Sequence, residues 1–221
     1  MLEIIAGDRD VFLWKSFSLL TQIRYSTYDW IIIPYRFFIM NLRHHFLIAM
    51  PLLRDPFFEN SLVYLCDHGE YGAMGVIVNK PAPVSMDVVF ATTGKATPDW
   101  FQGQYVMMGG PVQVERGFVV HTPVGNWQSS LRITDNIALT TSRDIIENQS
   151  NGDRAGQMLL AIGHSVWTAG QLERELVDNS WLTVPADETI LFNLPVEERY
   201  TAALSKLGIR PEMLTADAAH A

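Results

Sequence analysis

Two glycines and one arginine form the best candidate binding site in the sequence. Gly109-Gly110-Pro111 indicates a tight turn, and its glycines could leave backbone N–H groups free to line a concavity. The guanidinium of Arg116, shortly after the turn, is a planar fork suited to a carboxylate or a phosphate. Asn79 could add a polar rim to the same site. The alternative is a structural turn, with Arg116 paired to Glu115 or to an acid on a helix. The sequence has neither a P-loop lysine nor a GxGxxG pattern, so it predicts no nucleotide site.

Three histidines lie in or beside strand-like segments, and imidazole is a common zinc ligand. They are His68, His121 and His164. No two of them have the i, i+4 spacing that places ligands on one helical face, and no HExxH pattern occurs. Because each follows or ends a predicted strand, the simpler interpretation is three histidines hydrogen-bonded to backbone groups. The sequence therefore predicts no metal ion and no other cofactor, while His68 and His164 stay candidate ligand contacts.

Cys66 and His68 are spaced i, i+2 on a predicted strand, which would place both side chains on one face of a sheet. A histidine beside a cysteine is the minimum arrangement for an activated thiol. Asp67 lies between them and would face the other way. The alternative is an inert cysteine in the core, where cysteine is a common residue.

A second possible nucleophile is Ser165. Gly163-His164-Ser165 follows a predicted buried strand and precedes a helix, where a nucleophile elbow presents its serine. The elbow pattern is Gly-x-Ser-x-Gly, but Trp167 occupies the last position, and a bulky residue does not tolerate the sharp turn. We therefore expect Ser165 to be a small residue packed beneath a turn.

The stretch from Gln157 to Phe192 must position several of these residues. Residues 158–162 form an unbroken apolar run between Gly156 and Gly163, which predicts a short strand buried on both faces. A glycine-marked turn, a capped helix and a second strand should follow. This unit is the strongest structural signal in the chain.

The helix of this unit has recognisable start signals. Thr168 and Gln171 have the spacing of a capping box, and Trp167 and Leu172 have that of a hydrophobic staple. Leu172 should therefore lie on the buried face together with Leu176. The charged residues of the helix are expected in solvent: Glu173, Arg174, Glu175 and Asp178.

The remaining segments indicate the fold class. Residues 61–65 and 73–78 predict a hairpin, and Pro81 should end its second strand. Strand-like segments dominate the first two-thirds of the body, whereas helical segments are concentrated in the last third. A β-α-β-α-β run is expected over residues 137–185. This arrangement predicts an α+β fold.

The C-terminal part of the chain predicts one more helix. Leu194-Pro195 should open it, with acidic residues in its first turn, and Gly208 should end it. The polar, alanine-rich tail after Met213 is expected to be frayed.

Composition limits the class of partner. The chain has 221 residues, of which 48% are hydrophobic, and a net charge of −8. Residues 1–39 carry equal numbers of acids and bases, so the whole acidic excess lies in residues 40–221. An acidic body repels phosphate backbones and argues against a broad nucleic-acid face. The single cysteine, Cys66, excludes an intrachain disulfide, which is typical of a reducing compartment such as the cytoplasm.

The first 39 residues differ from the rest. They hold nine of the 24 aromatic residues, which follow neither a helical nor a strand period. Acids stand where a signal peptide is basic, and the best apolar run, 30–40, is about half the roughly 20 residues of a membrane span. We interpret residues 1–39 as an over-called extension, with translation starting at Met40. The alternative is an arm that binds a membrane surface or a partner.

Three motifs, in order, resemble the AlgH/YqgE family of small bacterial proteins. They are SLVYLCDHGEYGAMGVIVNKP, MMGGPVQVERGFVVH and AIGHSVWTAGQLERELVDNSWLTVPADETILF. The resemblance covers about residues 40–209. It implies a single α+β domain over residues 40–221, with a branched, mixed or antiparallel sheet that partly closes into a small barrel flanked by helices. The family's function is not established, although members have been called transcriptional regulators. One departure is at the central turn: where many members read roughly Gly-Tyr-Ala-Gly-Trp, this chain has Gly163-His164-Ser165-Val166-Trp167.

The sequence favours a non-catalytic binding or regulatory module for a small metabolite or a protein partner. The alternative is a hydrolase or group-transfer enzyme acting on a phosphorylated or carboxylated small molecule. It would use the region from Gly109 to Arg116 and either His68 or His164. A transcriptional regulator ranks third, because of the acidic charge and the lack of a helix-turn-helix pattern. Substrate, partner and oligomeric state do not follow from the sequence.

Overall fold

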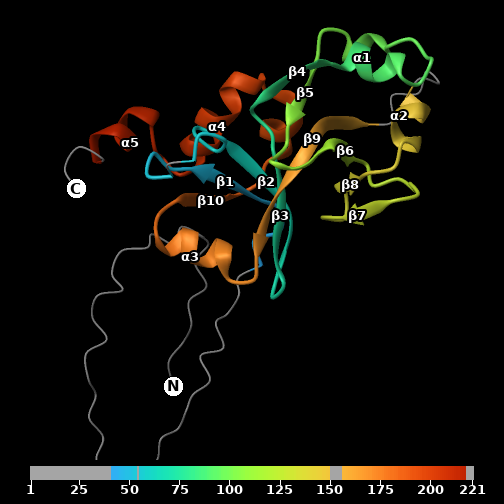
Figure 1. Cartoon of the computed structure of the whole chain (residues 1–221). Coiled ribbons are helices and arrows are strands. Elements are labelled where there is room, and N and C mark those ends of the chain that lie inside the picture. The colour runs from blue at the N-terminus through green and yellow to red at the C-terminus, as the bar shows by residue number, and fades with distance from the viewer. Residues whose placement is uncertain (1–40, 54, 150–155, 218–221) are drawn as a thin grey trace, which may run out of the picture. The chain divides into compact units, whose positions relative to one another are not determined.

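The sheet branches at its longest described strand, β9 (Gln157–Thr168). The computed structural model describes residues 41–53, 55–149 and 156–217. Within them, β9 crosses the centre of the body and pairs with β3, β5 and β6 (Figure 1). The strand is rich in buried apolar residues because neighbouring strands flank much of it.

The strands follow one another in the order β10-β1-β2-β3-β9-β6-β8-β7. Every pair along this path is antiparallel. Their bounds are β1 His45–Ala49, β2 Leu62–Gly69, β3 Gly72–Ile77, β6 Val112–Thr122, β7 Ser130–Arg132, β8 Ala138–Thr140 and β10 Trp181–Pro185. The predicted hairpin is the β2–β3 pair, so that prediction is confirmed.

A side branch makes the sheet mixed. β5 (Tyr105–Met108) pairs in parallel with β9 and antiparallel with β4 (Pro81–Ser85). The antiparallel strands curl into a half-barrel with helices around it, which confirms the predicted α+β fold. β4 was missed because its prolines were taken as the end of a strand. Proline is tolerated at strand positions whose N–H is not needed by the ladder.

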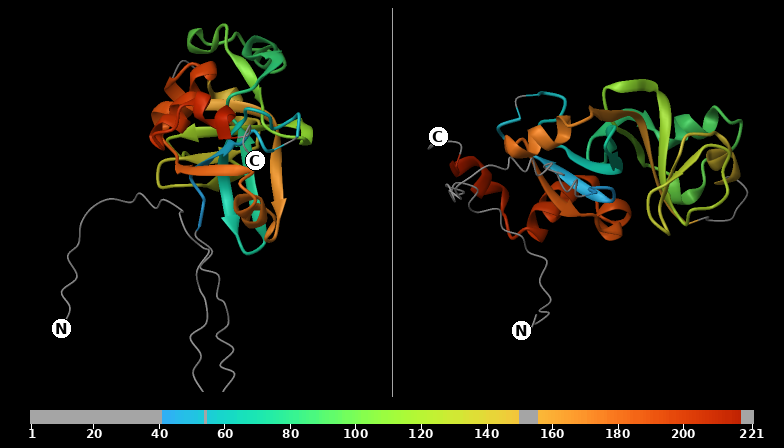
Figure 2. Two further views of the ribbon diagram at one scale, coloured as in Figure 1. Left: turned by 90° about the vertical axis from the view of Figure 1, so that its left-hand side faces the viewer. Right: turned by 90° about the horizontal axis from the view of Figure 1, so that it is seen from below.

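Helices cover the sheet at both ends, and three apolar clusters join them to it (Figures 1 and 2). The largest cluster packs α4 (Arg199–Lys206) and η2 (Thr189–Asn193) against the curled strands. The second packs α3 (Gln171–Val177) on β2 and β10, and the third packs α1 (Met86–Ala91) and α2 (Asp144–Gln149) beside β5, β6 and β9. The short helices η1 (Asp99–Phe101), η3 (Val196–Glu198) and α5 (Pro211–Asp217) complete the described elements.

The central unit differs from its prediction in two ways. β9 does not end at Gly163: that residue adopts φ +70° and the strand continues to Thr168. The capping box is also only half formed, because α3 has Gly170 as its N-cap. The Gln171 amide oxygen accepts a hydrogen bond from the backbone N–H of Thr168, as a capping box requires. It also accepts one from the Thr168 hydroxyl, which was expected to cap the helix instead.

The C-terminal elements are close to their prediction. η3 and α4 together form the helix predicted after Pro195, and Gly208 ends it with φ +70°. Of the tail that was predicted to fray after Met213, the part up to Asp217 is helical in α5, and residues 218–221 lie outside the described residues. The N-terminal extension predicted over residues 1–39 lies outside the described residues.

Candidate functional site

Close backbone contact explains the two glycines of the candidate turn. A Cβ on Gly110 would fall inside 3.0 Å of the peptide that joins His164 and Ser165. A Cβ on Gly109 would press on the carbonyl oxygen of Gly163 and would lie 2.9 Å from the Ala161 Cβ. The Gly109 N–H donates to Ile162, and its carbonyl accepts from Ile77. The turn is therefore packed directly on β9.

The same turn leads into a bulge in β6. Val112 pairs with His164 and Gly117 pairs with Ile162, so residues 113–116 stand opposite the single residue Gly163. Gly163 lets the strands approach here, since a Cβ on it would lie 3.3 Å from the Val114 Cα. The bulge carries the exposed side chains of Val114 and Arg116 to the surface.

His164 lies beneath this bulge with one ring nitrogen unused. The side chain is buried, and its Nδ1 has no hydrogen-bond partner among the described residues. Its ring centroid is 4.6 Å from that of Phe118. Burial lowers the pKa of His164, a backbone contact with Val112 opposes the shift, and the positive charge of Arg116 adds to it. The imidazole is therefore neutral at pH 7.

Arg116 is held by a hydroxyl and an aromatic ring. Its Nη2 donates to the Thr141 Oγ1 at 2.9 Å, and its guanidinium carbon lies 5.8 Å from the Phe118 ring centroid. The expected pairing with Glu115 or a helix acid is not among the ion pairs of the described chain. Arg116 thus stays exposed, with a planar fork available to an acceptor.

Exposed apolar side chains surround these residues. Val112 is 39% exposed, Val114 57% and Val166 48%. Val112 and Val166 are diagonal neighbours on one sheet face, because Val112 pairs with His164 and Val166 lies two residues further along β9. Val166 also pairs with Met74, which packs against the largest core cluster. We call this set the bulge surface: Val112, Val114, Arg116, His164 and Val166.

The structure brings four of the six predicted ligand residues together, namely Gly109, Gly110, Arg116 and His164. The Asn79 backbone also runs nearby, since Met108 N–H donates to the Lys80 carbonyl. The Asn79 side chain has a local role, however. It accepts from Leu62 N–H and donates to the Asn60 carbonyl, which ties the ends of β2 and β3 together.

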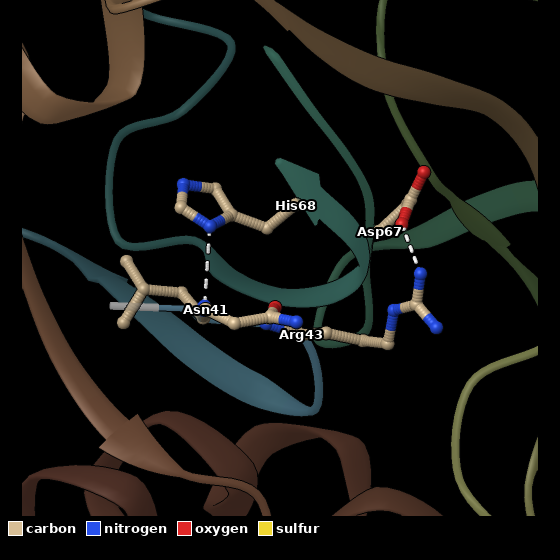
Figure 3. Close-up of polar contacts among 5 residues, drawn as sticks. Asn41, Arg43, Asp67 and His68 are labelled. Atoms are coloured by element: carbon tan, nitrogen blue, oxygen red, sulfur yellow. Dashed lines mark hydrogen bonds and ion pairs between the residues drawn. The ribbon is translucent and has the colours of Figure 1, made fainter. Parts of the chain in front are cut away.

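His68 contacts a different part of the fold. Its Nδ1 accepts from the backbone N–H of Leu42 at 3.1 Å, and its Nε2 is 3.0 Å from Glu173 Oε1 on α3. Since an N–H can only donate, neutral His68 must carry its proton on Nε2 and give it to Glu173. Beside the hydrogen bond from Leu42 to His68, Arg43 Nη2 and Asp67 Oδ1 form an ion pair at 2.6 Å (Figure 3). His68 therefore joins the segment before β1 to α3.

Cys66 is the inert core cysteine that the sequence offered as the alternative to an activated thiol. The shared face suggested by the i, i+2 spacing of Cys66 and His68 is lost because β2 has an irregularity at Cys66, where the register shifts between Leu65 and Asp67. Cys66 consequently lies in the largest core cluster with Tyr64, while His68 faces α3. The thiol is fully buried and bonds to the Tyr64 carbonyl, and burial raises its pKa. A neutral, enclosed thiol is not a nucleophile.

Ser165 is not in an elbow. It lies inside β9, is 1% exposed and donates from its hydroxyl to the Gly109 carbonyl at 3.3 Å. The expectation of a small packed residue was therefore right about the packing but wrong about the turn. The Ser165 hydroxyl instead adds a hydrogen bond where the glycine turn crosses the strand.

Sequence reasoning missed a carboxylate that organises α3. Glu175, expected in solvent, accepts the indole N–H groups of Trp167 at 2.9 Å and Trp181 at 2.8 Å. Its other oxygen accepts from Gln171, one helical turn earlier. The i, i+4 spacing of Gln171 and Glu175 was a visible signal, but the two tryptophans are brought to it only by the sheet.

The described part of the chain has a cavity of about 60 Å³ and a wider, open hollow of about 360 Å³ on η3 and α4, and neither is lined by a residue of the bulge surface. The cavity is lined by Trp100, Gln104, Met158 and Phe192, among others. Metabolite pockets typically have several hundred Å³. Within residues 41–53, 55–149 and 156–217, no three His, Cys, Asp or Glu side chains gather as metal ligands. No helix of this part is long and apolar enough to cross a membrane.

The fold and site define a class of small α+β proteins with a branched, curled sheet and a glycine turn packed on its central strand. The AlgH-like family model matches residues 46–212, so the chain belongs to this family. The resemblance inferred from the three motifs is thereby confirmed.

Relatives and solved structures agree with this assignment. A UPF0301 protein of Neisseria meningitidis serogroup B is 60% identical over 182 residues, covering 82% of this chain and 100% of the relative. A UPF0301 protein of Chromobacterium violaceum is 53% identical over 183 residues, covering 82% and 98%. The solution structure of AlgH from Pseudomonas aeruginosa matches with a TM-score of 0.67 at 43% identity, covering 82% and 97%. These matches establish the family and the fold, and not an activity.

Proposed function

We propose that this protein is a non-catalytic binding module that recognises a protein partner through the bulge surface. The observation that carries the proposal is the exposure of Val112, Val114 and Val166 around one bulge. Single exposed valines are common, but apolar residues gathered at one place indicate a contact site. Here they surround a buried imidazole with a free nitrogen and an exposed guanidinium.

The chemistry of the surface favours a protein over a metabolite. Protein interfaces combine an apolar centre with arginine, which matches the three valines and Arg116. Small molecules are usually held in enclosed pockets, and neither the cavity of about 60 Å³ nor the open hollow of about 360 Å³ on η3 and α4 includes a residue of the bulge surface. Cys66 and Ser165, the two nucleophiles considered from the sequence, are both buried and hydrogen-bonded. We expect the partner to present apolar side chains and an acceptor, such as a carboxylate, to Arg116.

A site-specific photo-crosslinker tests this proposal in cells of the native host. Placed at position 114, it should capture one protein reproducibly. The matched control is position 177 on α3, where Val177 is 70% exposed but lies outside the bulge surface. Arg116→Ala should reduce capture at position 114 without changing the far-UV circular dichroism. Equal capture at positions 114 and 177, or capture unaffected by Arg116→Ala, would refute the assignment.

We further propose that the binding unit is residues 40–221 and that it acts in the cytoplasm as a regulator whose effect depends on partner occupancy. The family match over residues 46–212 lies wholly inside this unit, which supports the first part. A lone, buried cysteine supports a reducing compartment. N-terminal sequencing of the native protein tests the boundary. A mature start at Met1 would contradict it.

A further inference from the structure

A chain of three side chains links the exposed surface of β7 to a buried histidine. Ser130 Oγ on β7 is 2.8 Å from Thr140 Oγ1 on β8, which is 2.8 Å from His121 Nε2 on β6. The other ring nitrogen, Nδ1, is 2.9 Å from the Pro123 carbonyl oxygen. His121 is 2% exposed and Thr140 is fully buried, whereas Ser130 is exposed. These contacts lie outside the bulge surface.

The direction of each hydrogen bond from Ser130 to Pro123 follows from the Pro123 carbonyl oxygen. A carbonyl oxygen can only accept, so His121 Nδ1 carries a proton and donates to Pro123. Burial lowers the pKa of His121, so the ring is neutral at pH 7 and its Nε2 is an acceptor. The Thr140 hydroxyl must then donate to Nε2. Its only proton is used there, so it accepts the proton of Ser130.

This polarity is that of an activated nucleophile. An exposed hydroxyl donates toward a neutral imidazole, and a third group holds the imidazole in the required tautomer. Here Thr140 stands between the hydroxyl and the base, and a backbone carbonyl takes the place of the orienting carboxylate. The Trp127 ring packs edge-on against His121 at 6.2 Å between centroids. The three described groups that contact the ring, from Pro123, Thr140 and Trp127, are uncharged.

The adjacent serine, Ser129, is also hydrogen-bonded to a threonine, but its series of hydrogen bonds does not lead to a base. Ser129 Oγ is 3.0 Å from Thr141 Oγ1, but the next group is the Arg116 guanidinium, which donates to Thr141 at 2.9 Å. A guanidinium cannot accept a proton. Two adjacent exposed serines thus each contact a threonine, but only the chain from Ser130 ends in a base.

We propose that Ser130 is a reactive hydroxyl that accepts an acyl group from activated acyl donors, with Thr140 and His121 as positioning residues that relay its proton. Ser130 Oγ forms a bond to the donor's carbonyl carbon, and the bond from that carbon to the leaving group breaks. The Ser130 proton passes to Thr140 Oγ1 while the Thr140 proton passes to His121 Nε2. The leaving group departs with its electron pair and takes up a proton from the imidazolium or from solvent. The product is an O-acyl serine at the exposed edge strand β7.

p-Nitrophenyl acetate, used as the acyl donor with the intact chain, tests this proposal. Released p-nitrophenolate gives the rate, and fragment-ion mass spectrometry locates the acetyl group. We expect acetylation of Ser130 to be at least about tenfold faster than acetylation of Ser129. General-base assistance typically contributes about a hundredfold or more, so a tenfold difference is a conservative threshold. Thr140→Val should remove this advantage, and Thr140→Ser should restore it. Ser129→Ala should leave the acetylation rate of Ser130 unchanged.

Two further readouts distinguish a relay from a merely exposed serine. The rate at Ser130 should fall as His121 becomes protonated at acid pH, while the rate at Ser129 should show no matching step. In urea both serines should react at the same slow rate. Equal acetylation of Ser129 and Ser130 in the folded wild-type protein would overturn the proposal, even if Thr140→Val fails to fold. So would a folded Thr140→Val variant with an unchanged rate.

Discussion

Gly110→Ala is the sharpest test of the packing beneath the bulge surface. All three atoms nearest to the added Cβ are backbone atoms of His164 and Ser165, and all lie inside 3.0 Å, whereas ordinary contacts begin at about 3.4 Å. A flexible side chain could move aside, but these atoms belong to β9 where it pairs with β3 and β6. Gly110 itself has no positive φ, so the penalty is steric and not conformational.

The expected cost is at the upper end of the overpacking range. An extra methylene in a packed core costs about 1–3 kcal/mol when neighbours can adjust. Because here the backbone of the central strand must shift, we expect a loss of about 3 kcal/mol in the free energy of unfolding. For a domain of this size that is a fall of roughly 6–12 °C in melting temperature.

Urea unfolding followed by tryptophan fluorescence measures this loss as a lower midpoint at an unchanged m-value. Gly69→Ala is the matched control, because a Cβ there has nothing within 4 Å and Gly69 has no positive φ. It should change stability by less than about 0.5 kcal/mol. If Gly110→Ala were as stable as Gly69→Ala, the close approach of the turn to β9 would be refuted.

Three further predictions follow from buried polar groups. Glu175→Gln should destabilise the fold by about 1–3 kcal/mol and alter the tryptophan emission, because one amide oxygen cannot replace both carboxylate oxygens for three donors; an unchanged urea midpoint would contradict this. Cys66 should not react with a thiol reagent in the native protein but should react fully in denaturant, because burial raises its pKa and encloses it; rapid native labelling would refute that assignment. Burial lowers the pKa values of His121 and His164 below 6.5, so the unfolded chain binds more protons in that window, and the free energy of unfolding should rise as pH increases toward about 6.5. Chemical denaturation across pH 5 to 7.5 measures this, and stability that falls over the same rise would contradict it.

Local sequence signals determined the fold class and several of the elements. The hairpin of β2 and β3, the alternation of strands and helices over residues 137–185 and the stop at Gly208 all follow from short-range patterns. Such patterns act within a few residues, so they are readable without the fold. The family was also identified from contiguous motifs, and the match over residues 46–212 confirms it.

Part of the candidate site was also readable from the sequence. Glycines grouped as in Gly109-Gly110 predict close backbone approach or a tight turn, and Arg116 was recognisable as an exposed fork. The partner of those glycines was not readable, because it is the peptide after His164, which lies more than fifty residues further along the chain. Ligand binding at Gly109, Gly110, Arg116 and His164 stays a prediction.

Only the tertiary structure decided which side chains meet. The irregularity in β2 separates Cys66 from His68 although their spacing places them together on a regular strand. The order of β6, β8 and β7 brings His121, Thr140 and Ser130 into one hydrogen-bonded chain. Sheet register turns each side chain to one face or the other, and a single inserted residue reverses that assignment. Register depends on contacts between distant segments, so spacing along the chain indicates several of the elements but not which side chains meet.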